Sequence, residues 1–243
     1  MGNQGMGREP CRLRKKIKLT THSKLMTEPG KKTLCSWSGG KDSCFALMRA
    51  IREGFDPRIL LTVLNEEGKI SRSHGIPSSI LMAQAAAIGL PFYAISSSWE
   101  DYETKFTAAL GKLKSTYELT HAVFGDIDLQ AHRDWEEKVC ANAGLTAVLP
   151  LWKEDRKQLV LQMLDSGIET MIVSCNETLG EHFLGRMISP ELINEFEQLG
   201  VDPCGENGEY HTLVLDCPLF ADRLAVTVAQ KVNYNNYWFA LVQ

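Results

Sequence analysis

The 243-residue sequence lacks the segments typical of membrane, secreted and disulfide-bonded proteins. No apolar run approaches the roughly 20 residues that span a bilayer, and the first residues lack the apolar core of a secretion signal. The seven cysteines are an odd number and include no Cys-x-x-Cys pair, which favours reduced thiols over a disulfide framework or a zinc site. We therefore expect a cytoplasmic protein without membrane contact.

Positive charge is scarce beyond the first 32 residues. Those residues carry nine Lys or Arg and two acids, whereas the rest of the chain carries 17 bases and 28 acids, a formal net charge of −11. Such an acidic body is a poor partner for nucleic acid, because phosphate contacts depend on clustered positive charge. Residues 1–32 are expected to form a disordered basic leader; a nucleic-acid-binding arm and a natural start at Met26 are the alternatives.

The Gly-x-x-x-x-Gly-Lys-Ser/Thr spacing of the common P-loop is also absent. The chain has instead a Ser-Gly-Gly-Lys-Asp-Ser loop at residues 38–43, between a strand expected at 33–37 and a helix expected from 44. Paired glycines let an anion approach bare backbone N–H groups, and the positive end of the helix favours that anion. The residues expected to hold phosphate are Ser36, Ser38, Gly39, Gly40, Lys41, Asp42 and Ser43.

Strand and helix candidates alternate over the first 150 residues. Strands are expected at 33–37, 58–64, 91–95 and 121–124, and helices at 44–51, 78–89, 102–119 and 130–143. This alternation predicts a parallel sheet with helices on both faces. Ligands of such sheets bind at the carboxyl ends of the strands, where both the phosphate loop and the turn at Gly125 fall.

The composition changes near residue 150, where we place a boundary between a first domain (33–150) and a smaller second domain (151–243). Glycine-punctuated pieces replace long helices beyond this point. The expected elements are helices at 153–166 and 190–199 and strands at 167–175, 224–228 and 237–242.

The turn at Gly125 is rich in charged side chains. If residues 130–143 form a helix, His132 and Glu136 lie four apart on one face and Arg133 lies one step round. A solvated helix start is the plain alternative, but the place opposite the phosphate loop favours a nucleotide or magnesium role. The expected oxygen ligands of Mg²⁺, which shares phosphate oxygens with its protein ligands, are Asp42, Asp126 and Asp128.

A second dense segment runs from residue 204 to 212. Glu206, Glu209 and His211 could converge there on a substrate amine, a metal or a proton. The alternative is a turn into a strand on which Glu209, His211 and Leu213 alternate on one face. Cys204 is interpreted as a small buried hydrophobe rather than as a reactive thiol.

Four motifs together resemble one family, the diphthine–ammonia ligases among the PP-loop ATPases (N-type ATP pyrophosphatases). They are Ser36 to Ser43, the turn at Gly125-Asp126-Ile127 with His132, Arg133, Trp135 and Glu136, the segment Phe183-Leu184-Gly185-Arg186, and residues 200–212. The resemblance covers the chain from about Lys32 to near the C-terminus, and the last motif is close to diagnostic. It implies a Rossmann-like α/β ATP-binding domain with a smaller α+β domain that completes the substrate cleft.

The resemblance also implies a reaction, the ATP-dependent amidation of diphthine, a modified histidine on elongation factor 2. A carboxylate oxygen would attack the α-phosphate, and the loop, Lys41 and Mg²⁺ would stabilise the departing pyrophosphate. Ammonia would then displace AMP; free ammonium is the expected donor, because no glutaminase nucleophile motif is evident.

The residue roles follow from this mechanism. Lys41 is a catalytic candidate, Glu206 and Glu209 are candidates for binding ammonium, and His211 and His132 are candidates for the base. Nucleotide contacts are expected to extend to Gly125, Asp126 and Arg133. The residues expected on the substrate side are Trp135, Glu136, Gly185, Arg186, Cys204, Gly205 and Gly208.

Three other functions stay open on the sequence alone. They are a PP-loop enzyme that modifies tRNA with the basic leader as an arm, a non-catalytic ATP- or AMP-binding regulatory module, and an amide ligase for a small metabolite. Retention of Lys41, Asp42 and Asp126 weighs against the regulatory module, since a protein that only binds the nucleotide does not need residues that hold a leaving pyrophosphate. The acceptor and the oligomeric state also stay open, with a homodimer as one alternative.

Overall fold

The computed structural model describes residues 30–243. The first 29 residues of the expected basic leader lie outside this range. The last two residues of that leader, Lys31 and Lys32, belong to the first strand, so this strand begins earlier than the expected residue 33.

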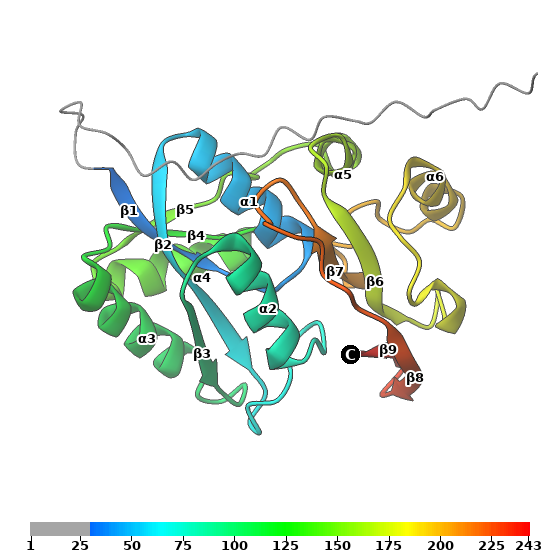
Figure 1. The fold of residues 1–243 in the computed structure, drawn as a ribbon, viewed down its shortest axis with the longest axis horizontal. Coiled ribbons are helices and arrows are strands. Elements are labelled where there is room, and N and C mark those ends of the chain that lie inside the picture. The colour runs from blue at the N-terminus through cyan, green and yellow to red at the C-terminus, as the bar shows by residue number, and fades with distance from the viewer. Residues whose placement is uncertain (1–29) are drawn as a thin grey trace, which may run out of the picture.

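The first part of the chain forms a five-stranded parallel sheet in the order β3-β2-β1-β4-β5 (Figure 1). Its strands are β1 Lys31–Ser36, β2 Phe55–Leu64, β3 Phe92–Ser96, β4 His121–Val123 and β5 Thr146–Val148. The central strands are apolar because both faces of the sheet are covered. The expected α/β fold is confirmed.

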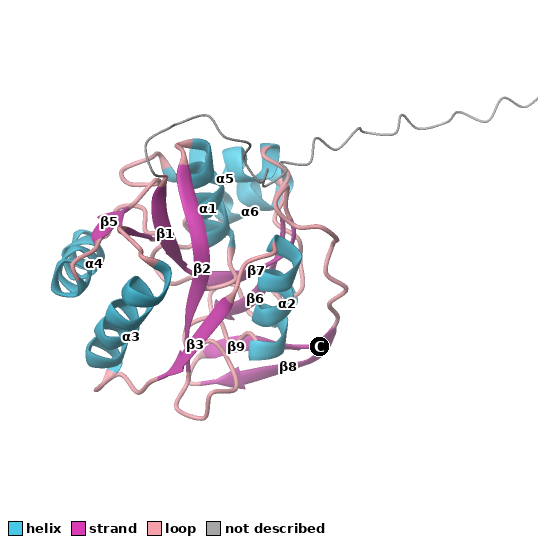
Figure 2. Cartoon of the chain, turned by 60° about the vertical axis from the view of Figure 1, so that its left-hand side comes forward, coloured by secondary structure: helices cyan, strands magenta, loops and turns pink. Residues whose placement is uncertain are grey.

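Two helices cover each face of this sheet. They are α1 Lys41–Arg52, α2 Ser78–Ile88, α3 Tyr102–Tyr117 and α4 Gln130–Ala143. Helices α3 and α4 lie on one face (Figure 2), over a core that includes Leu34, Phe106 and Val139. Helices α1 and α2 cover the other face and belong to a second core.

The second part of the chain forms an antiparallel sheet in the order β7-β6-β9-β8. Its strands and helices are α5 Arg156–Asp165, β6 Glu169–Asn176, the short 3₁₀ helix η1 Glu181–Phe183, α6 Pro190–Gln198, β7 Tyr210–Asp216, β8 Val228–Tyr234 and β9 Tyr237–Val242. Helix α6 begins with Ser189 as its cap and Pro190 in its first turn, a favoured way to start a helix.

The two sheets share one core. A continuous cluster of buried side chains runs from α1 and α2 into β6, β7 and α6, and includes Leu47, Leu81, Val173, Phe196 and Leu213. Helices α1 and α2 are therefore packed between the sheets. No helix within residues 30–243 combines the length and the apolar character needed to cross a membrane.

Several expected elements need correction. The strand expected at 224–228 is wrong: β8 begins at Val228, because its place is set by pairing with β9 across a turn at Asn235 and Asn236. Both asparagines have positive φ, 50° and 66°, as a tight hairpin turn requires. The three-residue strand β5 was missed, and α5 starts at Arg156 rather than 153 because Asp155 caps it.

Candidate active site

The carboxyl ends of β1 and β4 open into a cavity of about 840 Å³ that β7 and the loop before it close from the other side. The expected residues that line it are Ser36, Ser38, Lys41, Asp42, Ser43, Gly125, Asp126, His132, Trp135, Glu136, Cys204, Gly205, Glu206, Gly208 and His211. The structure thus brings together residues from motifs that lie far apart in the sequence.

The phosphate loop leads directly into helix α1, whose first residue is Lys41. Gly39 has a φ of 82°, a left-handed conformation that glycine adopts without strain. Ser38 and Ser43 place their hydroxyl oxygens 3.1 Å apart, and both side chains line the cavity. The loop therefore presents hydroxyl groups and the start of a helix to the same space, as expected of an anion site.

Gly125 lets the end of β4 press against this loop. A Cβ added at Gly125 would lie 2.7 Å from the backbone nitrogen of Ser43 and 2.8 Å from the carbonyl carbon of Asp42. Neither backbone atom can move away easily. The glycine in the expected Gly125 turn is thus required by the close approach of two backbones.

Lys41 points to the second sheet. Its ammonium group donates to Asp42 at 2.9 Å and to the backbone carbonyl of Cys204, and lies 5.2 Å from the centre of the Tyr210 ring. The residue is 2% exposed. Burial is the largest effect and opposes the charge, but Asp42, Tyr210, Cys204 and Glu206 together outweigh it and raise the Lys41 pKa above its ordinary value, so the side chain stays cationic.

Three side chains form the opposite wall. His132 Nδ1 donates to Asp126 at 2.7 Å, and Glu136 is 3% exposed. Burial, with the neighbouring Asp126 carboxylate, raises the Glu136 pKa to about 11. Burial alone would raise the pKa of Asp126, but hydrogen bonds from His132 and Glu136 lower it. Glu136 is therefore a neutral acid beside an ionised Asp126.

Two histidines meet near the phosphate loop, and the sequence analysis identified only one of them. The rings of His74 and His211 stack with centroids 4.6 Å apart, and both line the cavity. Burial lowers the pKa of His74 to about 4 and that of His211 to about 3. Both rings are neutral near pH 7. Only proximity in the fold pairs them, since no local motif marks His74.

The two glutamates of the loop before β7 have different surroundings. Glu206 lines the cavity, where burial and then the Asp42 carboxylate raise its pKa to about 8. Glu209 accepts hydrogen bonds from the backbone of Asp202 and from Asn207. It does not line the cavity and stabilises the loop, so its expected contact with ammonium stays a prediction. The strand expected to follow this turn exists as β7, which begins at Tyr210, one residue after Glu209.

The two glycines and the cysteine of this loop have structural tasks. Gly205 has a φ of 75° and leaves no room for a Cβ beside the Tyr210 carbonyl, and Gly208 accepts a hydrogen bond of 2.6 Å from the Tyr237 hydroxyl. Burial raises the pKa of the Cys204 thiol to about 12. Burial thus disfavours the thiolate form of Cys204, which fits its interpretation as a small buried residue.

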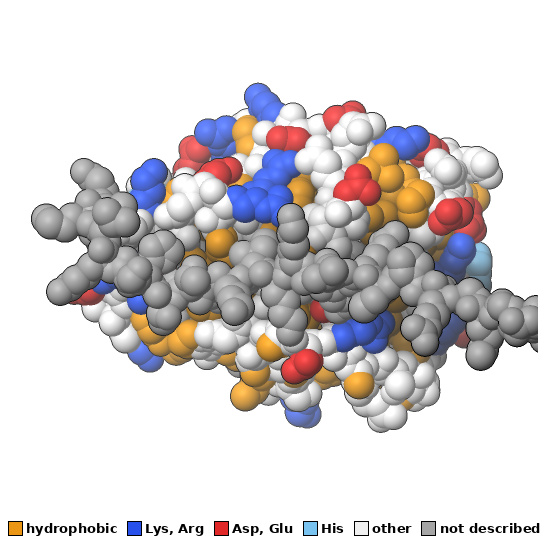
Figure 3. Space-filling model, turned by 45° about the horizontal axis from the view of Figure 1, so that its top comes forward, with side chains coloured by type: hydrophobic (Ala, Val, Ile, Leu, Met, Phe, Trp, Pro, Cys, Tyr) orange, Lys and Arg blue, Asp and Glu red, His pale blue; other side chains and the backbone are white. Residues whose placement is uncertain are grey.

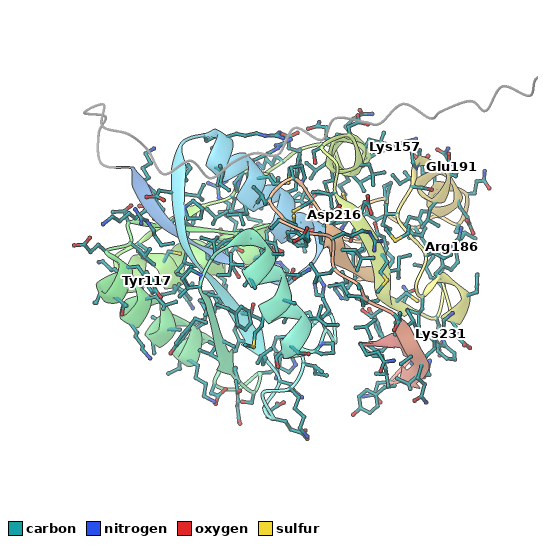
Figure 4. All side chains as sticks on the ribbon, in the orientation of Figure 1. Tyr117, Lys157, Arg186, Glu191, Asp216 and Lys231 are labelled. Atoms are coloured by element: carbon teal, nitrogen blue, oxygen red, sulfur yellow. The ribbon has the colours of Figure 1, made fainter. Side chains whose placement is uncertain are left out.

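Besides Glu209, four expected site residues outside the phosphate loop do not line the cavity. Asp128 is bound by Arg156, and Arg133 pairs with Glu137 at 2.7 Å. Arg186 binds Glu195 on the α6 side of the second sheet (Figure 4), and Gly185 precedes it there. The side chains of Asp128, Arg133 and Arg186 are thus held by partners within the chain, and their expected roles, with that of Gly185, stay predictions.

An aromatic wall lies opposite the phosphate loop, and of its residues only Trp135 was expected from the sequence. Tyr102, Phe106 and Trp135 contact one another with ring centroids 5.2 to 6.0 Å apart. Trp99 extends this wall to the surface, where it is 71% exposed and carries the Arg72 guanidinium 4.4 Å from its ring centre. Aromatic faces suit planar or cationic groups.

The carboxylates that remain near the loop suit a magnesium ion shared with phosphate. Within residues 30–243 no three or more His, Cys, Asp or Glu side chains are grouped as metal ligands. Magnesium, however, binds by one or two carboxylates together with substrate phosphates and water. Asp42 Oδ1 is buried without a hydrogen-bond partner, and Asp126 is close enough to influence the Asp42 pKa. Asp42 and Asp126 fit such an ion.

Comparisons with known proteins cover nearly the whole described chain. Residues 31–147 match the family model of the diphthamide synthase N-terminal domain, and residues 155–242 match that of its C-terminal domain. The diphthine–ammonia ligase of Rattus norvegicus is 28% identical over 236 residues, which cover 84% of this chain and 86% of that protein. The human enzyme is 29% identical over 231 residues, with the same two coverages.

Two further matches are more limited. The diphthine–ammonia ligase of Schizosaccharomyces pombe is 29% identical over 222 residues, which cover 82% of this chain but 36% of that protein. A crystal structure described as a predicted subunit of tRNA methyltransferase from Methanocaldococcus jannaschii has a TM-score of 0.45 and 15% identity, over 79% of this chain and 99% of that chain.

Proposed function

This chain belongs to the diphthamide synthase family, and from that premise we propose that it activates a carboxylate with ATP and amidates it with ammonia. It is a ligase of the diphthine–ammonia ligase type. The observation that carries the proposal is the single cavity that joins the phosphate loop to the Cys204–Thr212 segment. We further propose that residues 33–150 bind ATP and 151–243 complete the substrate site, a division supported by family matches at 31–147 and 155–242.

The phosphate loop binds the leaving group. The carboxylate oxygen of the acceptor attacks the α-phosphate of ATP, which gives an acyl-adenylate and releases pyrophosphate. Negative charge grows on the pyrophosphate as the bond breaks. Lys41, Ser38, Ser43 and the start of α1 are fixed before the reaction and stabilise that charge. Lys41 is effective because its ammonium group is already desolvated and cationic.

The second step requires an uncharged nucleophile. Ammonia is mostly ammonium near pH 7, so a cavity group must take its proton. Glu206 suits this task because its pKa of about 8 lies near the working pH, the optimum for a general base. His211 and His74 stay neutral and offer acceptor nitrogens in the same cavity, and His132 serves mainly to hold Asp126.

The remaining partners are also part of the proposal. Asp42 and Asp126 would hold Mg²⁺, which supplies positive charge to the phosphates when bound. Diphthine on elongation factor 2 is the acceptor we propose first, because the relatives are named diphthine–ammonia ligases. The aromatic wall from Trp99 to Trp135 would receive the acceptor or the adenine ring. We also propose that the chain works in the cytoplasm, where its six described cysteines stay reduced.

The face of the molecule shown in Figure 3 favours an amide ligase over a tRNA-modifying enzyme. Where side chains are visible in Figure 3, basic and acidic groups are interspersed. A nucleic-acid interface would instead show a basic stripe. The six described cysteines are buried as well.

The deciding experiment measures AMP and pyrophosphate release from ATP and Mg²⁺ with ammonium and a panel of carboxylate acceptors, including diphthine-bearing elongation factor 2. We expect acceptor-dependent release that Lys41→Ala abolishes. Lys157→Ala is the matched control, since Lys157 is exposed and pairs with Glu197 at 2.7 Å. ATP binding without α–β cleavage under every condition would favour a regulatory module, and ADP as product would refute the proposed role of the loop.

A further inference from the structure

The N-terminus of helix α1 is not capped by a side chain of a residue next to it in the sequence. Its N-cap residue is Gly40, which has no side chain to accept a hydrogen bond. The cap comes from strand β7, where Thr212 Oγ1 accepts a hydrogen bond of 3.1 Å from the backbone N–H of Lys41, 171 residues away. The side chain that caps helix α1 thus comes from the second sheet.

The backbone around Thr212 is fixed to the phosphate loop on both sides. His74 Nδ1 donates to the Thr212 carbonyl at 2.9 Å; because a carbonyl only accepts, this nitrogen carries the proton. The His74 ring packs on Gly40, where a Cβ would lie 2.6 Å from His74 Cε1. Two residues beyond Thr212, the N–H of Val214 donates to the Gly39 carbonyl at 2.9 Å. Thr212 therefore holds a defined position beside the loop.

The proton of the Thr212 hydroxyl has no acceptor among the described residues. A hydroxyl donates one hydrogen bond and accepts through its lone pairs, and here it accepts from Lys41. Among residues 30–243 no acceptor takes its own proton. Thr212 is 1% exposed, so bulk water does not reach it freely, yet it lines the cavity beside Lys41 and Asp42. A buried donor without an acceptor is costly unless a ligand oxygen accepts.

We infer that the Thr212 hydroxyl donates a hydrogen bond to a phosphate oxygen of ATP and to the departing pyrophosphate. The Lys41 N–H polarises the hydroxyl, so the positive end of helix α1 acts on the anion through an O–H group. The second sheet contributes this contact, and His74 positions it through the Thr212 carbonyl. The inference rests on the proposed function for the identity of the anion.

The test is calorimetric binding of inorganic pyrophosphate, with Mg²⁺, to the full chain and to Thr212→Ser and Thr212→Ala. Both variants lose the threonine methyl and differ only in the hydroxyl. We expect Thr212→Ser to bind within about threefold of the wild type, and Thr212→Ala about 10- to 100-fold more weakly, as for a lost hydrogen bond to a charged group. If Thr212→Ala does not fold, Thr212→Val, which keeps the volume, replaces it.

Thr170→Val is the matched control. Thr170 lies in the neighbouring strand β6, is also 1% exposed, and donates its hydroxyl proton to the Leu213 carbonyl at 2.9 Å. We expect a lower melting temperature and unchanged pyrophosphate affinity. An equal loss in Thr170→Val would mean that the effect is structural and would overturn the inference.

Two other results would also overturn it: equal affinities of Thr212→Ser and Thr212→Ala, or a wild-type chain that does not bind pyrophosphate. Failure of the amidation proposal is distinguishable from these. A wild type that binds pyrophosphate but forms no AMP with any acceptor would refute amidation, while the contrast between serine and alanine would still decide the role of the hydroxyl.

Discussion

Arg156 binds both carboxylate oxygens of Asp128, with hydrogen bonds of 2.8 and 2.7 Å. The same guanidinium donates to Asp202 at 2.7 Å and to Asn207 at 3.1 Å. One side chain at the start of α5 thus joins the turn after β4 to the loop before β7. Both carboxylate oxygens of Asp128, expected from the sequence to hold magnesium, are thus bound by Arg156 in this structure.

Arg156→Ala should reduce the free energy of unfolding by about 2 kcal/mol, because it leaves Asp202 nearly buried without its cationic partner. Arg156→Lys should recover only part of this loss, since an ammonium group cannot bind two oxygens in parallel. Urea denaturation measures both effects. A loss under about 0.5 kcal/mol, as for an exposed pair, would contradict the linking role.

Gly125→Ala should lower stability by about 2 kcal/mol, the cost of forcing atoms into a packed site, and weaken ATP binding at least about tenfold. The added Cβ would displace the backbone of Asp42 and Ser43. Gly111→Ala in helix α3 is the control: nothing lies within 4 Å of its Cβ position, so this change should stabilise the chain by about 0.5 kcal/mol. Similar results for the two variants would refute the steric argument.

Gln84→Leu should cost about 3 kcal/mol, because it leaves buried polar groups without partners. Gln84 accepts from Trp37 Nε1 at 2.9 Å and donates to the carbonyls of Gly39 and Val214 at 3.0 and 2.8 Å. Thermal and urea unfolding should both record the loss. The same change at Gln130, whose partner Asp134 is exposed, should alter stability by under about 0.5 kcal/mol.

Acid should destabilise the chain through His74 and His211. Their folded-state pKa values, about 4 and about 3, lie below the value of about 6.5 in the unfolded chain. The unfolded state therefore takes up protons first, and stability should fall as pH decreases from about 6.5 toward 4, by about 1 kcal/mol per unit for each ring.

Unfolding curves between pH 4 and 7.5 test this dependence. The variant His74→Asn, which keeps a donor for the Thr212 carbonyl, should reduce the slope, and addition of His211→Gln should reduce it further. An unchanged slope in the double variant would show that other groups cause the acid sensitivity.

Local patterns in the sequence were sufficient for much of the fold. Helix α4 runs over the expected residues 130–143 because its apolar period and the Gly144 stop are local signals. The phosphate loop was equally readable, since a strand, two glycines and a helix follow one another directly. The short strand β5 carries too few residues for any period to be visible.

Contacts between residues that lie far apart in the sequence could not be predicted from it. Nothing near Asp128 in the sequence reveals that Arg156 will bind it, and nothing near His74 reveals the ring of His211. The same holds for Glu209, which resembles a ligand in a dense motif yet folds back on Asn207. These assignments depend on distances between segments, which single-sequence patterns do not encode.

The contact between Lys41 and Thr212 also has a consequence for biosynthesis. Ribosomes make a chain from its N-terminus, at roughly 5 to 20 residues per second. The phosphate loop is therefore synthesised long before the strand that caps its helix, 171 residues later. The loop and its helix cannot reach the finished geometry until β7 has left the ribosome, so the proposed ATP site forms only after strand β7 of the second sheet has been made.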